Sequence, residues 1–248
     1  MSSRVALVTG GTGGIGTAIC QRLAKDGYKV AAGYNAGGDH DKAKTWQAVQ
    51  KEQGFDFDIS YGDVRDFESC GRCIAHVEET LGPIDILINN AGVTRDATLK
   101  KMSESQWSEV LNANLDSVFN MTRQVINGMI ERKFGRIVNV SSINAQKGQL
   151  GQTNYSAAKA GMHGFTKALS QEVARKGITV NTVSPGYIAT KMVMEVPEEI
   201  RNKIIEGIPV GRLGLPEEVA NAVSFLASEQ SGFITGSNLS VNGGQHMF

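Results

Sequence analysis

The sequence has no excess of charge of either sign, because 25 basic and 25 acidic residues give its 248 residues a formal net charge of +0. A chain that binds nucleic acid or an anionic membrane through its overall charge would carry a basic excess. We therefore expect neither nucleic acid nor membrane as a partner. Small molecules and further copies of the chain are the expected partners instead.

Long apolar runs are also absent, since none reaches the roughly 18 to 20 residues that a bilayer requires. The first residues, MSSRVALVTGG, contain neither a basic segment followed by a long apolar stretch nor a cleavage site. We therefore expect a soluble, cytoplasmic protein. No repeat, low-complexity tract or Pro/Ser-rich linker divides the sequence, which predicts that residues 1–248 form a single domain.

Cysteine is scarce, and two of the three cysteines, Cys70 and Cys73, form a C-x-x-C pattern that can indicate redox or zinc chemistry. A structural zinc site would need a second pair of ligands, which the sequence lacks. One helical stripe contains Phe67, Cys70, Ile74, Val77 and Leu81, with Asp66 as its N-cap and Gly82 beyond its end. We therefore interpret these cysteines as core residues and expect no metal site.

Apolar, β-branched runs alternate with longer segments of helical periodicity from one end of the sequence to the other. The runs are residues 4–9, 29–34, 55–60, 83–90, 135–142, 177–185 and 237–244. This alternation predicts an α/β fold, a Rossmann-type doubly wound parallel sheet of about seven strands with helices on both faces.

Two segments of helical periodicity stand out for their length, roughly residues 103–132 and 153–176. Both carry apolar side chains on more than one helical face, so each needs a second surface to cover it. A partner subunit is one candidate for that surface, and the sheet of the same chain is the other.

A glycine-rich turn, TGGTGGIG from Thr9 to Gly16, follows the first predicted strand and leads into an amphipathic segment. Glycines in such a turn let the backbone approach a pyrophosphate, whose charge is met by the amide groups of the helix N-terminus. The pattern fits two registers. One uses Gly11, Gly13 and Gly16, and the other uses Gly10, Gly14 and Gly16. The turn predicts dinucleotide binding, and its own residues leave the register open.

The end of the second predicted strand lacks the carboxylate that usually binds the ribose 2′-hydroxyl of NAD. Its residues there are Ala32, Gly33, Tyr34 and Asn35. An acidic group would repel a 2′-phosphate, so its absence favours NADPH over NADH. Lys42 is a candidate cation for the phosphate, although Asp39 and Asp41 beside it weaken that assignment.

Further motifs accompany the turn: NNAG at residues 89–92, NANL containing Asn114, Ser142 after the fifth strand, NYSAAKAG containing Tyr155 and Lys159, and PGYIAT after the sixth strand. A Tyr and a Lys four residues apart share one helical face, and alone that spacing is weak evidence. The whole set, from Thr9 to the final VNGG, resembles the short-chain dehydrogenase/reductase family. The resemblance implies the register of Gly10, Gly14 and Gly16.

Within that family, the stretches AGVTRDATLKKM, SSINAQKGQLGQTNYSAAKAG, SPGYIATKMV, IPVGRLGLPEEVA and NGGQHMF are similar to enzymes of polyhydroxyalkanoate synthesis. Those enzymes reduce acetoacetyl-CoA to (R)-3-hydroxybutyryl-CoA with NADPH and commonly form homotetramers. Enzymes that reduce 3-ketoacyl groups on a carrier protein share every catalytic motif and remain the alternative. Such a carrier would need a basic surface near the entrance, and Arg132, Lys133 and Lys176 are candidates for it.

The resemblance also implies a role for each catalytic position. Tyr155 would be the general acid, and Lys159 would lower the pKa of the phenol and bind the nicotinamide ribose. Ser142 would be a second donor to the carbonyl oxygen, unless it is an ordinary strand-end serine. Asn114 would hold a water that relays protons, unless it merely satisfies the helix backbone. A nucleotide-binding protein without activity should have lost one of these four, and all are present.

The same resemblance implies the binding residues. Cofactor contacts are expected from Gly10, Thr12, Gly14, Ile15, Gly16, Asn35, Lys42, Asp63, Val64, Asn89, Ala91, Gly92, Tyr155, Lys159, Pro185, Gly186, Ile188 and Thr190. For Ile15, packing in the core is the alternative to a cofactor contact, and Asp63 is expected to accept a hydrogen bond from the adenine amino group. Substrate contacts are expected from Asp96, Lys101, Ser142, Asn144, Gln146, Gln149, Tyr155 and Tyr187. Residues 192–209, within a predicted insertion at about 190–210, are expected to form a helical lid.

Overall fold

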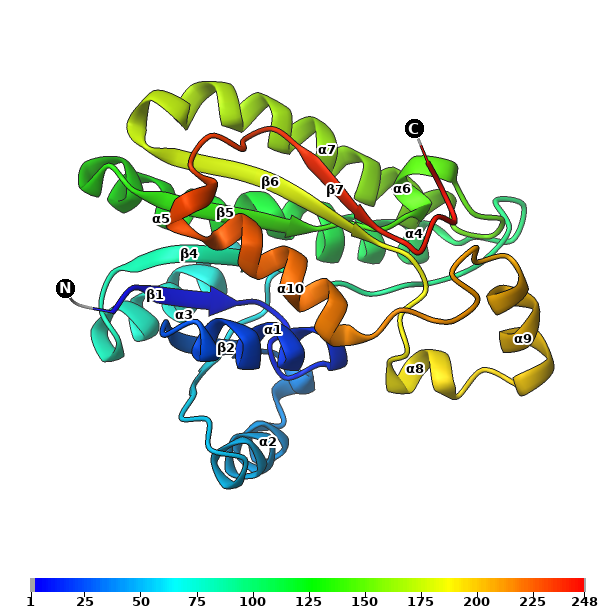
Figure 1. Ribbon diagram of the computed structural model, residues 1–248, viewed down its shortest axis with the longest axis horizontal. Coiled ribbons are helices and arrows are strands. Elements are labelled where there is room, and N and C mark those ends of the chain that lie inside the picture. The colour runs from blue at the N-terminus through cyan, green and yellow to red at the C-terminus, as the bar shows by residue number, and fades with distance from the viewer. Residues whose placement is uncertain (1–2, 248) are drawn as a thin grey trace.

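The predicted apolar runs fold as the strands of one parallel sheet, in the order β3-β2-β1-β4-β5-β6-β7 (Figure 1). The computed structural model describes residues 3–247. The strands are β1 (Val5–Val8), β2 (Lys29–Tyr34), β3 (Asp58–Tyr61), β4 (Ile84–Asn89), β5 (Gly135–Val140), β6 (Ile178–Pro185) and β7 (Asn238–Val241). The chain crosses from β3 back to the other side of β1, which confirms the doubly wound sheet predicted from the sequence.

Helices cover both faces of this sheet (Figure 1). They are α1 (Gly14–Lys25), α2 (His40–Glu52), α3 (Phe67–Thr80), α4 (Glu104–Leu111), α5 (Ser117–Arg132), α6 (Asn144–Lys147), α7 (Thr153–Val173), α8 (Lys191–Met194), α9 (Glu198–Glu206) and α10 (Pro216–Ala227). Short turns of other helix types are η1 (Ala36–Gly38), η2 (Asn112–Asp116), η3 (Ala174–Lys176) and η4 (Glu229–Ser231). None of the helices described is long and apolar enough to cross a membrane.

Alternating side chains of the central strands divide the core into two layers. On β1, Val8 packs with α1 and α10 on one face, whereas Leu7 packs with α3 and α5 on the other. Neighbouring β4 repeats the pattern with Ile88 and Leu87. All four side chains are fully buried, which is why the central strands are continuous apolar runs.

Local signals place the helices where the sequence predicts them. The side chain of Asp66 accepts a hydrogen bond from the backbone N–H of Ser69 and so caps α3, and Gly82 lies beyond its end with φ of 107°. Cys70 and Cys73 are free thiols that α3 turns into the core, as predicted. The predicted helix at residues 103–132 is α4 and α5 joined through η2, a single π-helical turn.

A chain of buried hydrogen bonds ties α7 to the centre of the sheet. The Asn89 side-chain amide donates to Asn139 Oδ1 at 2.8 Å, and the Asn139 amide donates to Thr166 Oγ1 at 2.9 Å. Thr166 Oγ1 in turn lies 2.9 Å from Thr182 Oγ1. These contacts join β4, β5, α7 and β6. They fix the position of α7 along the strands that it covers.

We expect Asn139→Ala to lower the free energy of unfolding by about 2–4 kcal/mol, because it leaves the buried polar groups of Asn89 and Thr166 without this partner. Urea unfolding followed by circular dichroism measures the change. Asn202→Ala, at an exposed position on α9, is the matched control and should change the stability by less than about 0.5 kcal/mol. Equal stabilities of the two variants would contradict the structural role of the chain of hydrogen bonds.

Candidate functional site

The predicted site residues meet at the C-terminal ends of the strands, where the chain crosses between β1 and β4. In open α/β sheets this edge is where ligands bind. Thr9, directly after β1, holds the two crossing loops together, because its Oγ1 accepts the backbone N–H groups of Asn90 and Ala91, both at 3.0 Å. The Asn90 side chain donates back to the carbonyl oxygen of Thr9 at 2.9 Å.

The glycine turn between β1 and α1 is tightly closed. Gly10 has φ of 63°, and a Cβ on Gly16 would overlap the carbonyl oxygen of Gly10. Gly14 is the first residue of α1, and a Cβ there would lie 3.3 Å from Thr190 Cγ2. The N-terminal amides of α1 therefore face the loop that follows β6. This arrangement suits an anion at the helix N-terminus.

The remaining predicted residues of these two loops differ in their exposure. Thr12 is partly exposed in the turn, whereas Ile15 is partly buried and packs against the core beneath α1. Pro185 ends β6, and a Cβ on Gly186 would lie 2.9 Å from Asn242 Cα. Ile188 is buried in the core layer under α10. Ile15 and Ile188 thus set the position of the loops through packing.

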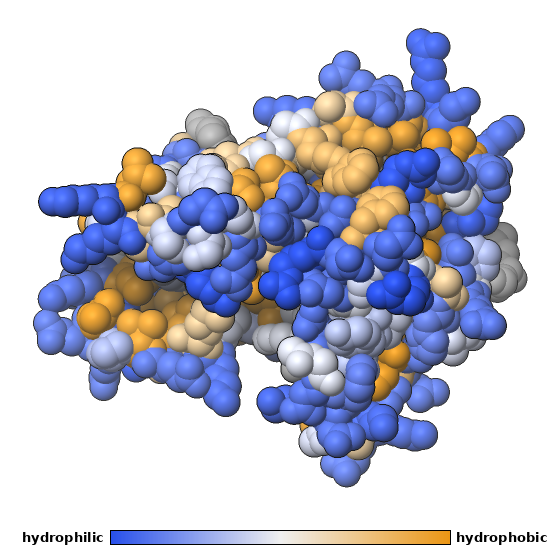
Figure 2. Space-filling model, turned by 180° about the vertical axis from the view of Figure 1, so that it is seen from behind, coloured by the Kyte–Doolittle hydropathy of each residue, from blue (hydrophilic) through white to orange (hydrophobic). Residues whose placement is uncertain are grey.

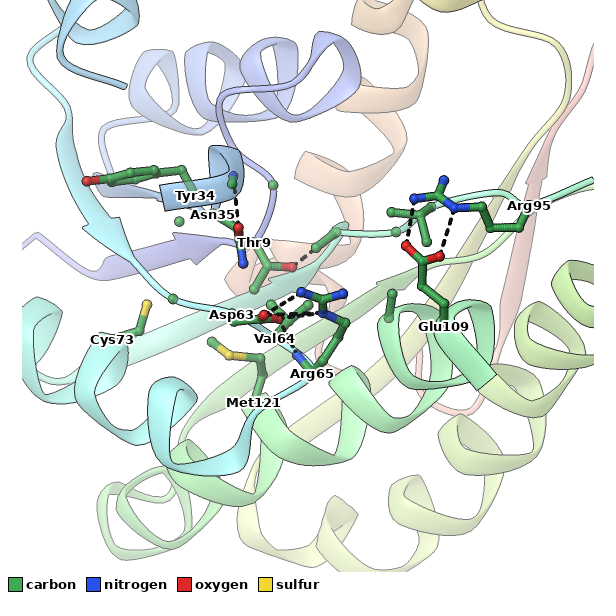
Figure 3. A pocket seen from close by; sticks show the side chains of 18 residues that line it. Thr9, Tyr34, Asn35, Asp63, Val64, Arg65, Cys73, Arg95, Glu109 and Met121 are labelled. Atoms are coloured by element: carbon green, nitrogen blue, oxygen red, sulfur yellow. Dashed lines mark hydrogen bonds and ion pairs between the residues drawn. The ribbon is translucent and has the colours of Figure 1, made fainter. Parts of the chain in front are cut away.

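A cavity of about 410 Å³ extends from the glycine turn along the ends of β2, β3 and β4 (Figure 3). Its size is ordinary for a small-molecule site. Six of the predicted cofactor residues line it: Gly10, Asn35, Asp63, Val64, Ala91 and Gly92. Sequence reasoning missed Arg65 and Arg95, which also line it. Arg65 directly follows the predicted pair of Asp63 and Val64, and this adjacency was the available signal.

Lys42 and Asn89 are among the predicted cofactor residues that do not line this cavity. Lys42 points along α2, where its Nζ lies 3.1 Å from Asp39 Oδ2 and its side chain is 76% exposed. The neighbouring acidic residue holds the ammonium, as its position in the sequence suggested, and the role of Lys42 as a cation for the phosphate stays a prediction. Asn89 is buried below the cavity, where its amide binds Asn139.

Tyr155 and Lys159 lie one helical turn apart on α7 and share one face. The Lys159 ammonium is 5.7 Å from the centroid of the Tyr155 ring. It donates to the carbonyl oxygen of Val140, at the end of β5, at 2.8 Å. Only 3% of Lys159 is exposed. The predicted pair is therefore brought together at the strand ends.

Burial shifts the pKa values of this pair in opposite directions, because it disfavours the charged form of each group. It raises the pKa of Tyr155 to about 12, and a hydrogen bond with Ser142 opposes the shift. It lowers the pKa of Lys159 to about 7. In the protein without cofactor the cost of burying the phenolate dominates the pKa of Tyr155, and the lowering effect expected of Lys159 stays a prediction.

Ser141 and Ser142 face opposite ways at the end of β5, as neighbouring residues of an extended chain do. Ser141 Oγ donates to the backbone carbonyl of Lys159 at 2.9 Å and so supports α7. Ser142 is hydrogen-bonded to Tyr155, and its Oγ accepts the backbone N–H of Asn144 at 3.1 Å. Ser142 is thus the serine on the side of the phenol, as predicted.

Asn114 lies in the π-helical turn and is fully buried. Its amide donates to the carbonyl oxygens of Val93 at 2.8 Å and Val110 at 2.9 Å, which leaves its Oδ1 without a partner in the protein. A Cβ on Gly92 would overlap that Oδ1 and would lie 3.4 Å from Lys159 Nζ. Asn114 Oδ1 and Lys159 Nζ therefore flank the same glycine, where the oxygen can accept a hydrogen bond from a bound group.

A polar chain lies beside Tyr155 on the side away from the cavity. The Asn144 amide donates to Gln152 Oε1, and the Gln152 amide donates to Asp96 Oδ2, both at 2.9 Å. The charge of Asp96 raises the pKa of both Tyr155 and Tyr187, to which burial contributes most, so the two phenols lie near the same carboxylate. Gln152 joins two predicted substrate residues, Asn144 and Asp96. Sequence reasoning missed it, although it lies in the same loop between Ser142 and Tyr155.

The other predicted substrate residues are not brought to the phenol. Gln146 is held at 3.2 Å by Ser240 of β7, and Gln149 lies 3.4 Å from Lys147 Nζ. Lys101 is exposed in the turn before α4. Their assignment as substrate contacts has no support in the contacts that these side chains make.

The predicted insertion after β6 is helical and forms α8 and α9, which project from the body of the molecule (Figure 1). Its apolar side chains are open to solvent, with Met192 72% and Ile200 51% exposed. Seen from behind, apolar side chains gather around a hollow beside this arm (Figure 2). At its far end, the backbone N–H of Val210 donates to the carbonyl oxygen of Gly243 at 3.2 Å.

The basic residues considered for a carrier protein lie at the opposite edge of the sheet. Arg132 ends α5 and donates to the carbonyl oxygen of Ile84, at the start of β4. Lys133 lies against Gly177, and Lys176 precedes β6. The expectation that they surround the entrance is therefore wrong within one chain, because both helices run from the site edge to the other edge.

These features fit a dinucleotide. A Cβ on Gly16 would overlap the backbone of the glycine turn, the cavity of about 410 Å³ is ordinary for a small-molecule site, and Asn114 presents an acceptor beside Lys159. Among residues 3–247, no group of three or more His, Cys, Asp or Glu side chains is arranged to hold a metal ion.

Residues 4–201 match the sequence profile of the family described as short chain dehydrogenase. The chain is 57% identical over 247 residues to an acetoacetyl-CoA reductase of Cupriavidus necator, with 100% of each chain covered. It is 59% identical to an acetoacetyl-CoA reductase of Rhizobium meliloti, covering 98% of this chain and 99% of the relative. A 3-oxoacyl-acyl-carrier-protein reductase of Vibrio cholerae is 42% identical, covering 100% and 99%. The chain therefore belongs to the short-chain dehydrogenase/reductase family.

Proposed function

We propose that this protein reduces acetoacetyl-CoA to (R)-3-hydroxybutyryl-CoA with NADPH, as a step of polyhydroxybutyrate synthesis. The observation that carries the proposal is the cluster of Tyr155, Ser142 and Lys159 beside a dinucleotide cavity. The names of the full-length relatives at 57% and 59% identity support the choice of substrate.

Each catalytic side chain has one task in this proposal. The ketone carbon would receive a hydride, which a reduced nicotinamide would supply when bound in the site. Tyr155, which its high pKa keeps protonated, donates the phenolic proton to the ketone oxygen, and Ser142 donates a second hydrogen bond to that oxygen. Lys159 in its charged form stabilises the phenolate that remains. Asn114 Oδ1 accepts a hydrogen bond from a water that relays protons towards Lys159.

The preference for NADPH is supported by the end of β2. Tyr34 and Asn35 present no carboxylate to the ribose, so nothing at this position repels a 2′-phosphate. The same proposal includes the other predicted cofactor contacts. The glycine turn would contact the pyrophosphate, Asp63 and Val64 the adenine, and Thr190 the carboxamide.

For the substrate, we propose that Asn144, Tyr187 and Asp96 border the acetoacetyl group, and that α8 and α9 close over it as a lid. The support is the polar chain next to Tyr155 and the exposed apolar side chains on the arm. A shut lid would cover these side chains and exclude water from the reaction.

We further propose a cytoplasmic homotetramer in which residues 1–248 act as one domain. The tetramer is supported by an exposed apolar position on α5, within the long helical segment predicted from the sequence. Phe119 there is 51% exposed, and its ring centroid lies 6.0 Å from that of Phe67. A second copy of the chain would cover such an apolar face.

The second candidate is reduction of a 3-oxoacyl group on a carrier protein, favoured by the relative at 42% identity that bears this name. Initial rates with acetoacetyl-CoA and with the acetoacetyl-carrier protein, each with NADPH and with NADH, separate the two. We expect the higher kcat/KM for acetoacetyl-CoA with NADPH and an R-configured product. A large preference for the carrier protein would overturn the choice of substrate.

Tyr155→Phe should lower kcat at least about 100-fold, because it removes the acid while keeping the ring. The dissociation constant of NADPH, measured by fluorescence titration, should stay unchanged. Tyr28→Phe, in the turn between α1 and β2, is the matched control and should keep full activity. Full turnover by Tyr155→Phe would refute the assignment of the acid.

The rate of reduction should depend on the charge of Lys159. The buried amine is protonated below its pKa of about 7 and loses its charge as the pH rises. Tyr155, with a pKa of about 12, stays protonated over the same range. We therefore expect kcat/KM, which reports the ionisation of the free enzyme, to fall as the pH rises above about 7. A kcat/KM that climbs steadily to pH 10 would show that the charged amine is not required.

A further inference from the structure

Arg65, in the turn between β3 and α3, is bound to the carboxylate that the adenine amino group is expected to use. Its Nε lies 2.9 Å from Asp63 Oδ1, and its Nη2 lies 2.6 Å from Asp63 Oδ2. The backbone N–H of Arg65 also donates to Oδ1, at 3.0 Å. The pair lies in the wall of the adenosine cavity with Asn35 beside it (Figure 3).

Arg65 occupies most of the Asp63 carboxylate in this arrangement. A carboxylate offers about four acceptor positions, and Arg65 fills three of them through its backbone N–H, Nε and Nη2. These hydrogen bonds hold the pKa of Asp63 low, with the Arg65 side chain as the largest cause. An adenine amino group therefore competes with Arg65 for this carboxylate. The Arg65 side chain is 47% exposed, so a bound phosphate can reach its guanidinium.

Arg65 is also placed to meet a 2′-phosphate. Of the described residues that line the cavity, Arg65 and Arg95 carry positive charge. Arg95 is paired with Glu109 at 2.6 Å on the far side (Figure 3). Lys42 is outside the cavity and paired with Asp39. The residue at the end of β2 usually reads the ribose 2′ position, and Asn35, directly after β2, lines the same cavity as Asp63 and Arg65.

We propose that Arg65 is the specificity-determining residue for the 2′-phosphate of NADPH, and that its guanidinium exchanges Asp63 for the phosphate when the cofactor binds. The exchange replaces one charge-assisted pair by another, because a guanidinium matches carboxylate and phosphate equally well. It also frees an Asp63 oxygen for the adenine amino group. With NADH no phosphate draws Arg65 away, so the adenine meets an occupied acceptor. The proposal rests on the proposed use of NADPH.

Two nucleotides that fill only the adenosine half test this directly. Calorimetric titration of the full-length protein with 2′,5′-ADP and with 5′-AMP measures the contribution of the 2′-phosphate alone. We expect Arg65→Gln to weaken 2′,5′-ADP binding roughly 10- to 100-fold, the usual range for one charge-assisted hydrogen-bonded pair. Binding of 5′-AMP should not weaken, because Asp63 is then free to accept the amino group. Arg65→Lys should retain part of the preference for 2′,5′-ADP.

Lys42→Gln is the matched control, since it removes a cation of the neighbouring helix α2 that does not line the cavity. It should leave the binding of both nucleotides unchanged. The proposal would be overturned if Arg65→Gln lost the same factor of affinity for both nucleotides at an unchanged melting temperature, because Arg65 would then act on the adenine ring or on the loop. It would also be overturned if only Lys42→Gln lost affinity for 2′,5′-ADP, because Lys42 would then bind the phosphate.

This test needs no acyl substrate, so a failure to reduce acetoacetyl-CoA would leave it standing. A wild-type protein that binds 5′-AMP as tightly as 2′,5′-ADP would remove the premise of NADPH specificity and the proposal with it. NADPH and NADH titrations on the same variants extend the comparison to the whole cofactor, where the ratio of their dissociation constants should fall towards one in Arg65→Gln.

Discussion

The buried amine of Lys159 is the constraint on which the site depends. A lysine so deeply enclosed must have its donors met, and the carbonyl oxygen of Val140 accepts one of them. That contact fixes α7 against the end of β5, and the Ser141 hydroxyl reinforces it by donating to the Lys159 backbone carbonyl. Tyr155, one turn earlier, is carried to the strand ends by the same contacts.

Opposite α7, the chain leaves space for this amine and supplies an acceptor beside it. Gly92 has no side chain to fill the space, and the π-helical turn brings Asn114 Oδ1 to the other side of the glycine. A single π turn of this kind often marks a functional site, because it redirects one side chain without ending the helix. The crossing between β1 and β4, joined by Thr9, brings these loops next to the glycine turn.

Much of this arrangement was predictable from the sequence, because it follows from periodicity. The apolar runs predicted the parallel sheet, and the spacing of Tyr155 and Lys159 predicted their common face. The family resemblance assigned Ser142 to the carbonyl oxygen, and alternation along an extended chain explains why Ser141 faces the other way. The cap at Asp66 and the glycine after α3 followed from local hydrogen bonding and backbone conformation.

The errors arose where side-chain direction or burial decided the outcome. Lys42 lies in the first turn of α2, where the N-cap residue Asp39, three residues earlier, holds its ammonium. Arg132 and Lys176 are at the ends of helices that lead away from the site, which the sequence order of strand and helix already implied. The pKa of Tyr155 depends on how much water reaches the phenol, and no spacing in the sequence reports that.

The pKa of the Lys159 amine in the cofactor-free protein tests the central claim most directly. An NMR titration of the Lys159 side chain, with its signal identified by its absence in Lys159→Met, measures this value. Enclosure against Val140 predicts a pKa near 7, well below that of a solvated lysine. A pKa near the unperturbed value of about 10.4 would show that water reaches the amine and would contradict the account of the site.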